Sequence, residues 1–115
     1  FIYKKHCCCS KKNSHEIVAT KDAPAAVGAY SQATKIGKTV YCSGQIGLKP
    51  ETGVLIEGGV AIQTRQALTN LEAVLKEAGS SLSQVLKCTV LLEDINDFTK
   101  VNSVYASFFG ESQPP

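Results

Sequence analysis

The sequence has 115 residues, 43% of them apolar and only 19% charged, which is typical of one small globular domain and not of a disordered or fibrous protein. No apolar run approaches the roughly 20 residues that a membrane-spanning helix needs, so we expect a soluble protein. Four of the twelve basic residues and one of the ten acidic residues lie in residues 1–16, and the remaining charges nearly cancel, which argues against nucleic-acid binding driven by bulk charge.

Residues 1–16 show neither a helical nor a strand period, so we predict a disordered or non-native tail followed by one domain over residues 17–115. Cys7-Cys8-Cys9 lie in this tail between His6 and His15. Adjacent cysteines lack the separation of about two to four residues that lets thiolates surround one zinc ion, so we predict no metal site. Palmitoylation and a transit peptide stay open as alternatives, and we expect a cytoplasmic protein or one of the mitochondrion or another organelle.

The first half of the domain has the features of antiparallel strands. Residues 17–20 form a short candidate strand, and residues 30–36 and 39–47 are extended stretches separated by Gly37-Lys38, which suits a two-residue hairpin turn of type II′. Residues 49–53 then place a proline and a glycine where a turn needs them, and a loop or third hairpin follows.

The second half has helical periodicity on both sides of one more strand. Residues 60–78 predict a helix that Gly79 ends, with Glu72 and Lys76 as an exposed ion pair. Its buried face comprises Ala67, Leu68, Leu71, Val74, Leu75 and Ala78.

Residues 85–93 alternate as in a half-buried strand, and a second helix follows, capped by Asn96 or Asp97 and closed by Gly110. Its predicted buried stripe comprises Phe98, Val101, Tyr105, Phe108 and Phe109. The order ββ(β)αβα predicts an α+β sandwich of two layers, with a mostly antiparallel sheet and two helices on one face. Because such a helix normally covers a sheet, we expect a strand after Pro115 to complete this sheet.

Several consecutive blocks resemble the reactive intermediate deaminase (Rid/YjgF) family, continuously from about residue 17 to residue 115. These blocks are residues 23–33, Tyr41-Cys42-Ser43-Gly44-Gln45-Ile46-Gly47, Pro50-Glu51-Thr52-Gly53, residues 66–71, Lys87-Cys88-Thr89-Val90, residues 94–98, Val101-Asn102 and Tyr105. The resemblance implies a chorismate-mutase-like fold of the YjgF/RutC type and a homotrimer with active sites between subunits. It also implies hydrolysis of enamine and imine intermediates, such as 2-aminoacrylate, to 2-keto acids and ammonia, without a metal or organic cofactor.

The resemblance assigns substrate-binding roles to Tyr30, to Ser43 and Gly44, and to Asn102. The family's carboxylate-binding arginine and its glutamate would both follow Pro115, so no catalytic residue is assigned and we expect the chain to be a C-terminally truncated fragment. Arg65 is the only arginine, and its helical position does not match the catalytic one. Ala29 departs from the proline that family members often have before the tyrosine, which loosens this loop.

Each site residue also has a purely structural interpretation. Tyr30 can be a strand residue half packed on the core, and Ser43-Gly44 can mark a close backbone approach or a bulge. Asn102 can satisfy a nearby backbone group. Cys42 and Cys88 lie within predicted strands and are expected to be small, buried, inert thiols.

Three functions remain open from the sequence. The first is the imine deaminase, acting on a small imino acid. The second is endoribonuclease or translation-inhibitor activity, which a nearly neutral domain does not favour. The third is a non-catalytic oligomeric module, since the segment expected to carry the charged groups is missing; exposed sheet edges would then make the chain prone to aggregation.

Overall fold

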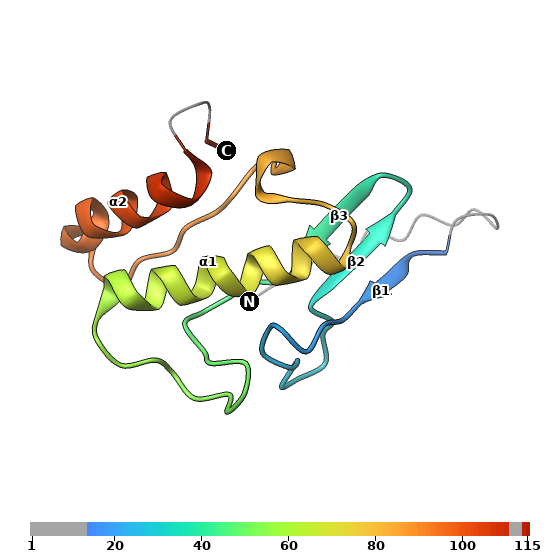
Figure 1. Ribbon diagram of the computed structural model, residues 1–115, viewed down its shortest axis with the longest axis horizontal. Helices are drawn as coiled ribbons and strands as arrows, with labels where there is room; N and C mark the ends of the chain where they lie inside the picture. Colours follow the sequence, from blue (N-terminus) through green and yellow to red (C-terminus); the bar gives the residue numbers. More distant parts are fainter. Residues whose placement is uncertain (1–13, 111–113) are drawn as a thin grey trace.

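A computed structural model describes residues 14–110 and 114–115 of the chain. Three strands come first and two helices follow, without the strand that the sequence predicts between the two helices (Figure 1). The elements are β1 (Glu16–Val18), β2 (Ala33–Ile36), β3 (Thr39–Cys42), α1 (Val60–Glu77), the short 3-10 helices η1 (Leu82–Gln84) and η2 (Ile95–Asp97), and α2 (Phe98–Phe109). The α+β class with two layers is confirmed: α1 covers one face of the sheet, and α2 lies beside α1.

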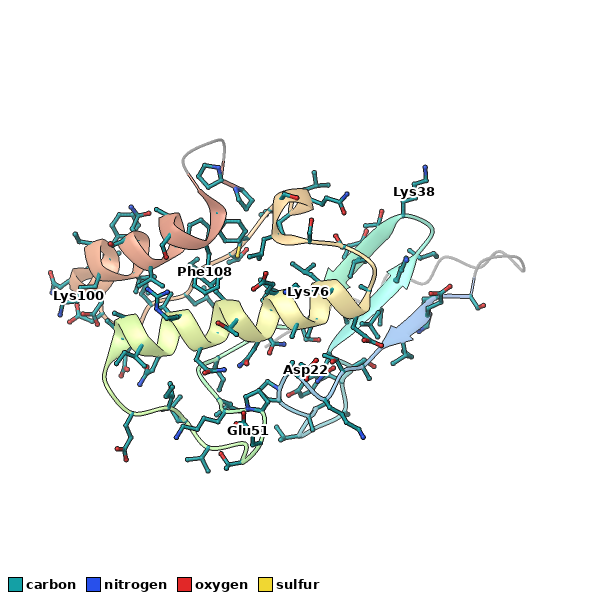
Figure 2. All side chains as sticks on the ribbon, viewed as in Figure 1. Asp22, Lys38, Glu51, Lys76, Lys100 and Phe108 are labelled. Carbon is teal, nitrogen blue, oxygen red and sulfur yellow. The ribbon has the colours of Figure 1, made fainter. Side chains whose placement is uncertain are left out.

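The three strands form one antiparallel sheet in the order β1-β2-β3. Ile36 pairs with Thr39 across the predicted two-residue turn, and Gly37 has φ 58, the positive value that hairpin turns of this kind require. Lys38 lies at the tip of this hairpin and points away from the body of the protein (Figure 2). β2 and β3 are shorter than the extended stretches predicted over residues 30–36 and 39–47. The ladder between them ends at Ala33 and Cys42, at the end away from the hairpin turn.

The core lies between the sheet and α1. Val18 and Ala33 pair across β1 and β2, and they pack with Ala23 against Val74 and Ala78 of the helix, all at 6% exposure or less. Burying these apolar side chains contributes about 25 cal/mol for each Å² removed from water. Of the predicted face of α1, Val74 and Ala78 therefore pack against the sheet, whereas Ala67 and Leu71 are only partly buried.

The end of α1 follows the prediction closely. Gly79 has φ 79, its N–H donates to the Lys76 carbonyl at 3.0 Å, and the Ser80 N–H donates to the Leu75 carbonyl at 2.8 Å. This pattern is the Schellman motif, which satisfies carbonyls of the last helical turn and needs a left-handed residue at the glycine position. The exposed Glu72–Lys76 ion pair is also present, at 3.3 Å.

The loop between β3 and α1 is fixed by one buried asparagine that the sequence reading passed over. Asn70 is fully buried on α1, and its Nδ2 donates to the carbonyls of Ile46 at 3.1 Å and Leu48 at 2.9 Å. Gln66 donates to its Oδ1 at 2.9 Å. This polar residue interrupts the apolar face of α1, and it holds the loop that leaves the candidate site.

The packing of α2 corrects part of the prediction. Val101 and Val104 are its buried residues, whereas Phe98 is 56% exposed and does not belong to the buried stripe. Phe98 is the first residue of the helix, where α2 has only begun to meet α1. Asp97 is the N-cap by position but makes no side-chain capping bond; instead Asp94 accepts from the Asn96 N–H in η2. Gly110 ends the helix as predicted, with φ 73.

Residues 85–93 are the clearest correction, since they do not form a hydrogen-bonded strand. Among the described residues, the main chain of residues 86–92 has no backbone hydrogen-bond partner. The segment runs from η1 to η2 in the same general direction as β3 (Figure 1). The alternation in the sequence predicts an extended chain. A β-strand also needs a neighbouring strand within about 5 Å, and β3 is too distant to pair with residues 85–93.

Two further predictions concern membrane-spanning helices and metal sites. In the described part of the chain, no helix is long and apolar enough to cross a membrane. The same residues contain no group of three or more side chains suited to hold a metal ion. The triple cysteine and most of the predicted tail lie outside the described residues, and β1 begins at Glu16, the last residue of that predicted tail.

Candidate active site

Tyr30 lies in the loop that leads into β2 and is 45% exposed. Its ring packs over Gly28, at 3.6 Å from the position that a Cβ would take there, and its hydroxyl oxygen accepts from the Val27 N–H at 3.4 Å. The Tyr30 N–H donates to the Gly28 carbonyl at 2.9 Å, which closes a tight turn. The loop therefore holds the phenol half exposed at the surface, and Tyr30 does not belong to a strand.

Gln32 fixes this loop, and the sequence reading gave it no role. Its side chain is 5% exposed and binds the backbone on the other side of the loop at four points. The Thr20 N–H donates to its Oε1 at 2.6 Å, and its Nε2 donates to the carbonyls of Thr20, Ala23 and Pro24 at 2.9–3.3 Å. Because a buried amide with these partners leaves no polar atom unsatisfied, Gln32 ties the loop before Tyr30 to the end of β1.

Ser43 follows β3 directly and extends its pairing with the tyrosine loop. Its N–H donates to the Gln32 carbonyl at 2.9 Å, and its Oγ donates to the Ser31 carbonyl at 2.5 Å. The structure thus brings Ser43 beside the residue that follows Tyr30. Since the hydroxyl proton is engaged, the oxygen lone pairs of Ser43 remain available to accept a hydrogen bond from a ligand.

Gly44 is exposed at the end of β3, and a Cβ built there would meet nothing within 4 Å. The interpretation of this glycine as a close approach within the chain is therefore not supported. Hydrogen-bonding direction alternates along a strand, so the Ser43 N–H that faces β2 implies that the main chain of Gly44 faces away from β2. The N–H of Gly44 is placed where it can donate to an anionic ligand.

Ser43 and Gly44 line a cleft of about 1670 Å³, whereas Tyr30 and Asn102 do not. The cleft lies between β3, α1, residues 85–94 and the near side of α2. Asn102 is exposed on α2, next to the buried Val101. Within one chain, hydrogen bonds connect Ser43 to Ser31 and Gln32, which follow Tyr30, whereas the cleft includes Ser43 and Gly44 but neither Tyr30 nor Asn102.

Cys42, Cys88 and Tyr105 form a group on the cleft walls. Burial, and then the nearby Cys88 thiol, raise the pKa of Cys42 above its ordinary value of 9.0. Burial, and then Cys88, raise the pKa of Tyr105 to about 12, and the Tyr105 hydroxyl donates to the Pro115 carbonyl at 2.8 Å. Cys42 and Tyr105 are thus neutral near pH 7, so neither supplies an anionic base or nucleophile for catalysis.

Arg65 is engaged in packing between the helices. Its guanidinium lies 5.8 Å from the ring centroid of Phe108, within reach of a cation–π contact, and Phe108 projects between α1 and α2 (Figure 2). The residues that line the cleft also include three lysines, Lys35, Lys38 and Lys87.

Known proteins resemble this chain over most of its length. Residues 20–115 match the protein family described as Endoribonuclease L-PSP. A protein of Bos taurus named 2-iminobutanoate/2-iminopropanoate deaminase is 52% identical over 99 residues, which are 86% of this chain and 72% of that protein.

Two solved structures share the fold. RidA from the Antarctic bacterium Psychrobacter sp. PAMC 21119 is 45% identical with a TM-score of 0.82, over 86% of this chain and 80% of that one. TdcF of E. coli, solved with bound serine, is 40% identical with a TM-score of 0.80, over 87% of this chain and 78% of that one.

Proposed function

Since the chain belongs to the Rid/YjgF family, the family described as Endoribonuclease L-PSP, we propose that it acts in the hydrolysis of reactive enamines and imines derived from 2-amino acids. The reaction consumes one water molecule and converts the C=N carbon into a ketone, releasing ammonia and a 2-keto acid. The name of the bovine relative supports this substrate class, and the serine bound to TdcF shows that a similar protein holds a small amino acid.

The observation that carries the proposal is the open position at Gly44, next to Ser43, whose hydroxyl donates to the carbonyl of Ser31, the residue after the surface phenol of Tyr30. An imine carbon is already electrophilic, so holding the substrate and water in position supplies much of the rate. The Gly44 N–H can donate to the substrate carboxylate or to the developing oxyanion, and Ser43 Oγ can accept from the substrate nitrogen. Tyr30 can pass a proton through its hydroxyl.

In this proposal, Tyr30, Ser43 and Gly44 surround the substrate, and they supply no charged group to the site. The guanidinium of Arg65 lies over the ring of Phe108, and this contact supports the proposal that Arg65 takes no part in catalysis.

We propose further that the site is completed in a homotrimer. The sheet face opposite α1 exposes Ile17 at 60%, Ile36 at 41% and Tyr41 at 65%, on three neighbouring strands. Ile17, Thr34 and Tyr41 lie in one cross-strand row of this face. Exposed apolar side chains on a small domain favour a partner subunit, and a neighbour would also supply the Asn102 that one chain leaves apart.

A matched pair of variants tests the function. 2-Aminoacrylate generated in the cuvette from an amino acid is the substrate, and released ammonia is measured with the purified protein. Tyr30→Phe removes only the hydroxyl and should lower kcat/KM at least about tenfold, whereas Val27→Ala, in the same loop and 83% exposed, should leave it unchanged. Equal activities of wild type and Tyr30→Phe would exclude the phenol from the reaction.

The family description also names an endoribonuclease, which defines the competing outcome. If the protein cleaved RNA with a steep loss of binding at higher salt, and left 2-aminoacrylate unaffected, the deaminase proposal would be wrong.

A further inference from the structure

Gln32 lies between Tyr30 and Ser43 in the hydrogen-bond network of the candidate site. Its main-chain carbonyl accepts from the Ser43 N–H at 2.9 Å, and the neighbouring Ser31 carbonyl accepts from the Ser43 hydroxyl at 2.5 Å. Its side chain is buried and donates to the Pro24 carbonyl at 2.9 Å. One residue therefore contacts both Ser43 and the start of the loop that carries Tyr30.

The loop of residues 25–30 is exposed along its whole length, so packing does not fix its position. In the described part of the chain, the loop residues before Tyr30 make hydrogen bonds only to Tyr30. The Val27 N–H donates to the Tyr30 hydroxyl, and the Gly28 carbonyl accepts from the Tyr30 N–H. The phenol is thus tied to its own loop, and its place in the site depends on how the ends of the loop are held. The side chain of Gln32 holds the first end.

The sheet does not need this side chain to align β1 with β2. Their ladder joins three residue pairs, and the last of them, Val18 and Ala33, is buried in the core. The four hydrogen bonds of the Gln32 side chain all go to residues 20–24, past the end of β1. The side chain therefore contributes to the position of the loop more than to the pairing of the strands.

An amide suits this position, and a carboxylate does not. The Oε1 of Gln32 accepts from the Thr20 N–H, while its Nε2 donates to three main-chain carbonyls, those of Thr20, Ala23 and Pro24. A carboxylate of the same shape has no proton to donate, and it would place a buried negative charge against three carbonyl oxygens. Gln32→Glu therefore releases the loop with almost no change in side-chain volume.

We propose that Gln32 is a positioning residue of the candidate site. Its side chain fixes the Tyr30 phenol relative to Ser43, and it influences imine hydrolysis only through that phenol. Gln32 is 5% exposed, so it does not itself contact the substrate. This role rests on the proposed function, because Tyr30 is a catalytic residue only if the protein acts on an imine.

A double-mutant cycle in the ammonia assay distinguishes positioning from a general structural role. With Tyr30 present, Gln32→Glu should lower kcat/KM for 2-aminoacrylate at least about fivefold, because a displaced phenol transfers a proton less effectively. In the Tyr30→Phe background, the same change should lower kcat/KM less than about twofold, because no hydroxyl is left to position. Equal losses in the two backgrounds would overturn the proposal.

Fluorine NMR reports the position of the phenol without any turnover. The chain has four tyrosines, so 3-fluorotyrosine gives four signals, and Tyr30→Phe identifies the Tyr30 signal by its loss. Gln32→Glu should shift or broaden the Tyr30 signal and leave that of Tyr105 on α2 unchanged. An unchanged Tyr30 signal would overturn the proposal. A wild-type protein without activity would instead refute the proposed function, and the fluorine signal would still decide whether Gln32 holds the phenol.

Val104→Ala is the control for lost stability. Val104 is buried on α2, so shortening its side chain destabilises the protein without changing a contact of the Tyr30 loop. At a temperature where all variants are folded, Val104→Ala should keep the wild-type kcat/KM and the wild-type Tyr30 signal. A loss as large as that of Gln32→Glu would overturn the proposal. If Gln32→Glu does not fold, Gln32→Met, which has a similar length and no charge, replaces it in both measurements.

Discussion

Gly44 and Gly47 have opposite surroundings. At the residue scale, this contrast distinguishes a glycine that the fold requires from one that the fold does not require. A Cβ at Gly44 would meet nothing within 4 Å, whereas a Cβ at Gly47 would lie 2.9 Å from the Cα of Gln63 on α1. Gly47 is therefore required where the loop crosses the helix. Gly44 has no such requirement within the described chain, which is consistent with the proposed ligand contact at this position.

Gly47→Ala should lower the free energy of unfolding by about 1–3 kcal/mol, because the added methyl group forces the loop away from α1. Gly44→Ala should change it by no more than about 0.5 kcal/mol and should instead lower kcat/KM for the imine. Urea unfolding and the ammonia assay on the two variants measure both effects. A large loss of stability in Gly44→Ala would show that this glycine serves the fold.

The protonation of Cys42 and Tyr105 predicts how stability depends on pH. Both groups have a raised pKa in the folded chain, from 9.0 for the thiol and from 10.0 to about 12 for the phenol. The unfolded chain therefore loses these protons first, and the stabilisation, complete below about pH 9, is lost as the pH rises toward 12.

Urea midpoints measured from about pH 8 to pH 11 should accordingly decrease. Tyr105→Phe should flatten the upper part of this dependence, since the phenol no longer titrates. A midpoint that stays constant or rises over the range would contradict the raised pKa values.

At the scale of the elements, α1 is tied to the loop after β3 by one amide. Asn70→Leu would leave the carbonyls of Ile46 and Leu48 without their donor and should cost about 2–4 kcal/mol of stability. Gln66→Ala removes a single hydrogen bond to the same side chain and should cost only about 0.5–1.5 kcal/mol. Chemical denaturation compares the two, and equal losses would mean that the loop does not depend on Asn70.

The elements also show what the sequence could predict. The hairpin at Gly37 and the end of α1 at Gly79 depend on local backbone geometry, so a few residues suffice to identify them. Residues 85–93 have the alternation of a strand, but pairing depends on a neighbour that local pattern does not specify. Gln32 and Asn70 are polar residues whose main-chain partners lie 8–24 positions away, and no periodicity marks them.

The candidate site was predictable only through the family resemblance. Tyr30, Ser43 and Gly44 have no distinctive spacing, and hydrogen bonds between the Tyr30 loop and β3 bring them together. Asn102 belongs to α2 and meets no member of this group in one chain. Its assignment depends on the proposed homotrimer, which no pattern within the chain describes.

At the scale of the whole molecule, the exposed apolar row of the sheet predicts association. Tyr41→Lys places a charge at one end of that row and should shift the particle mass from three chains toward one, as measured by light scattering after gel filtration. Lys49→Tyr, in the loop after β3, is the control and should leave the mass unchanged. A wild-type protein that is monomeric at all concentrations would exclude the proposed trimer.

The central claim is that this fold serves imine hydrolysis, and the rate with 2-iminobutanoate tests it most directly. The imine is generated from threonine by a dehydratase, and 2-oxobutanoate and ammonia are followed with and without the purified protein. We expect the protein to accelerate formation of both products in equal amounts, well above the uncatalysed rate. Product formation at the uncatalysed rate would contradict the account.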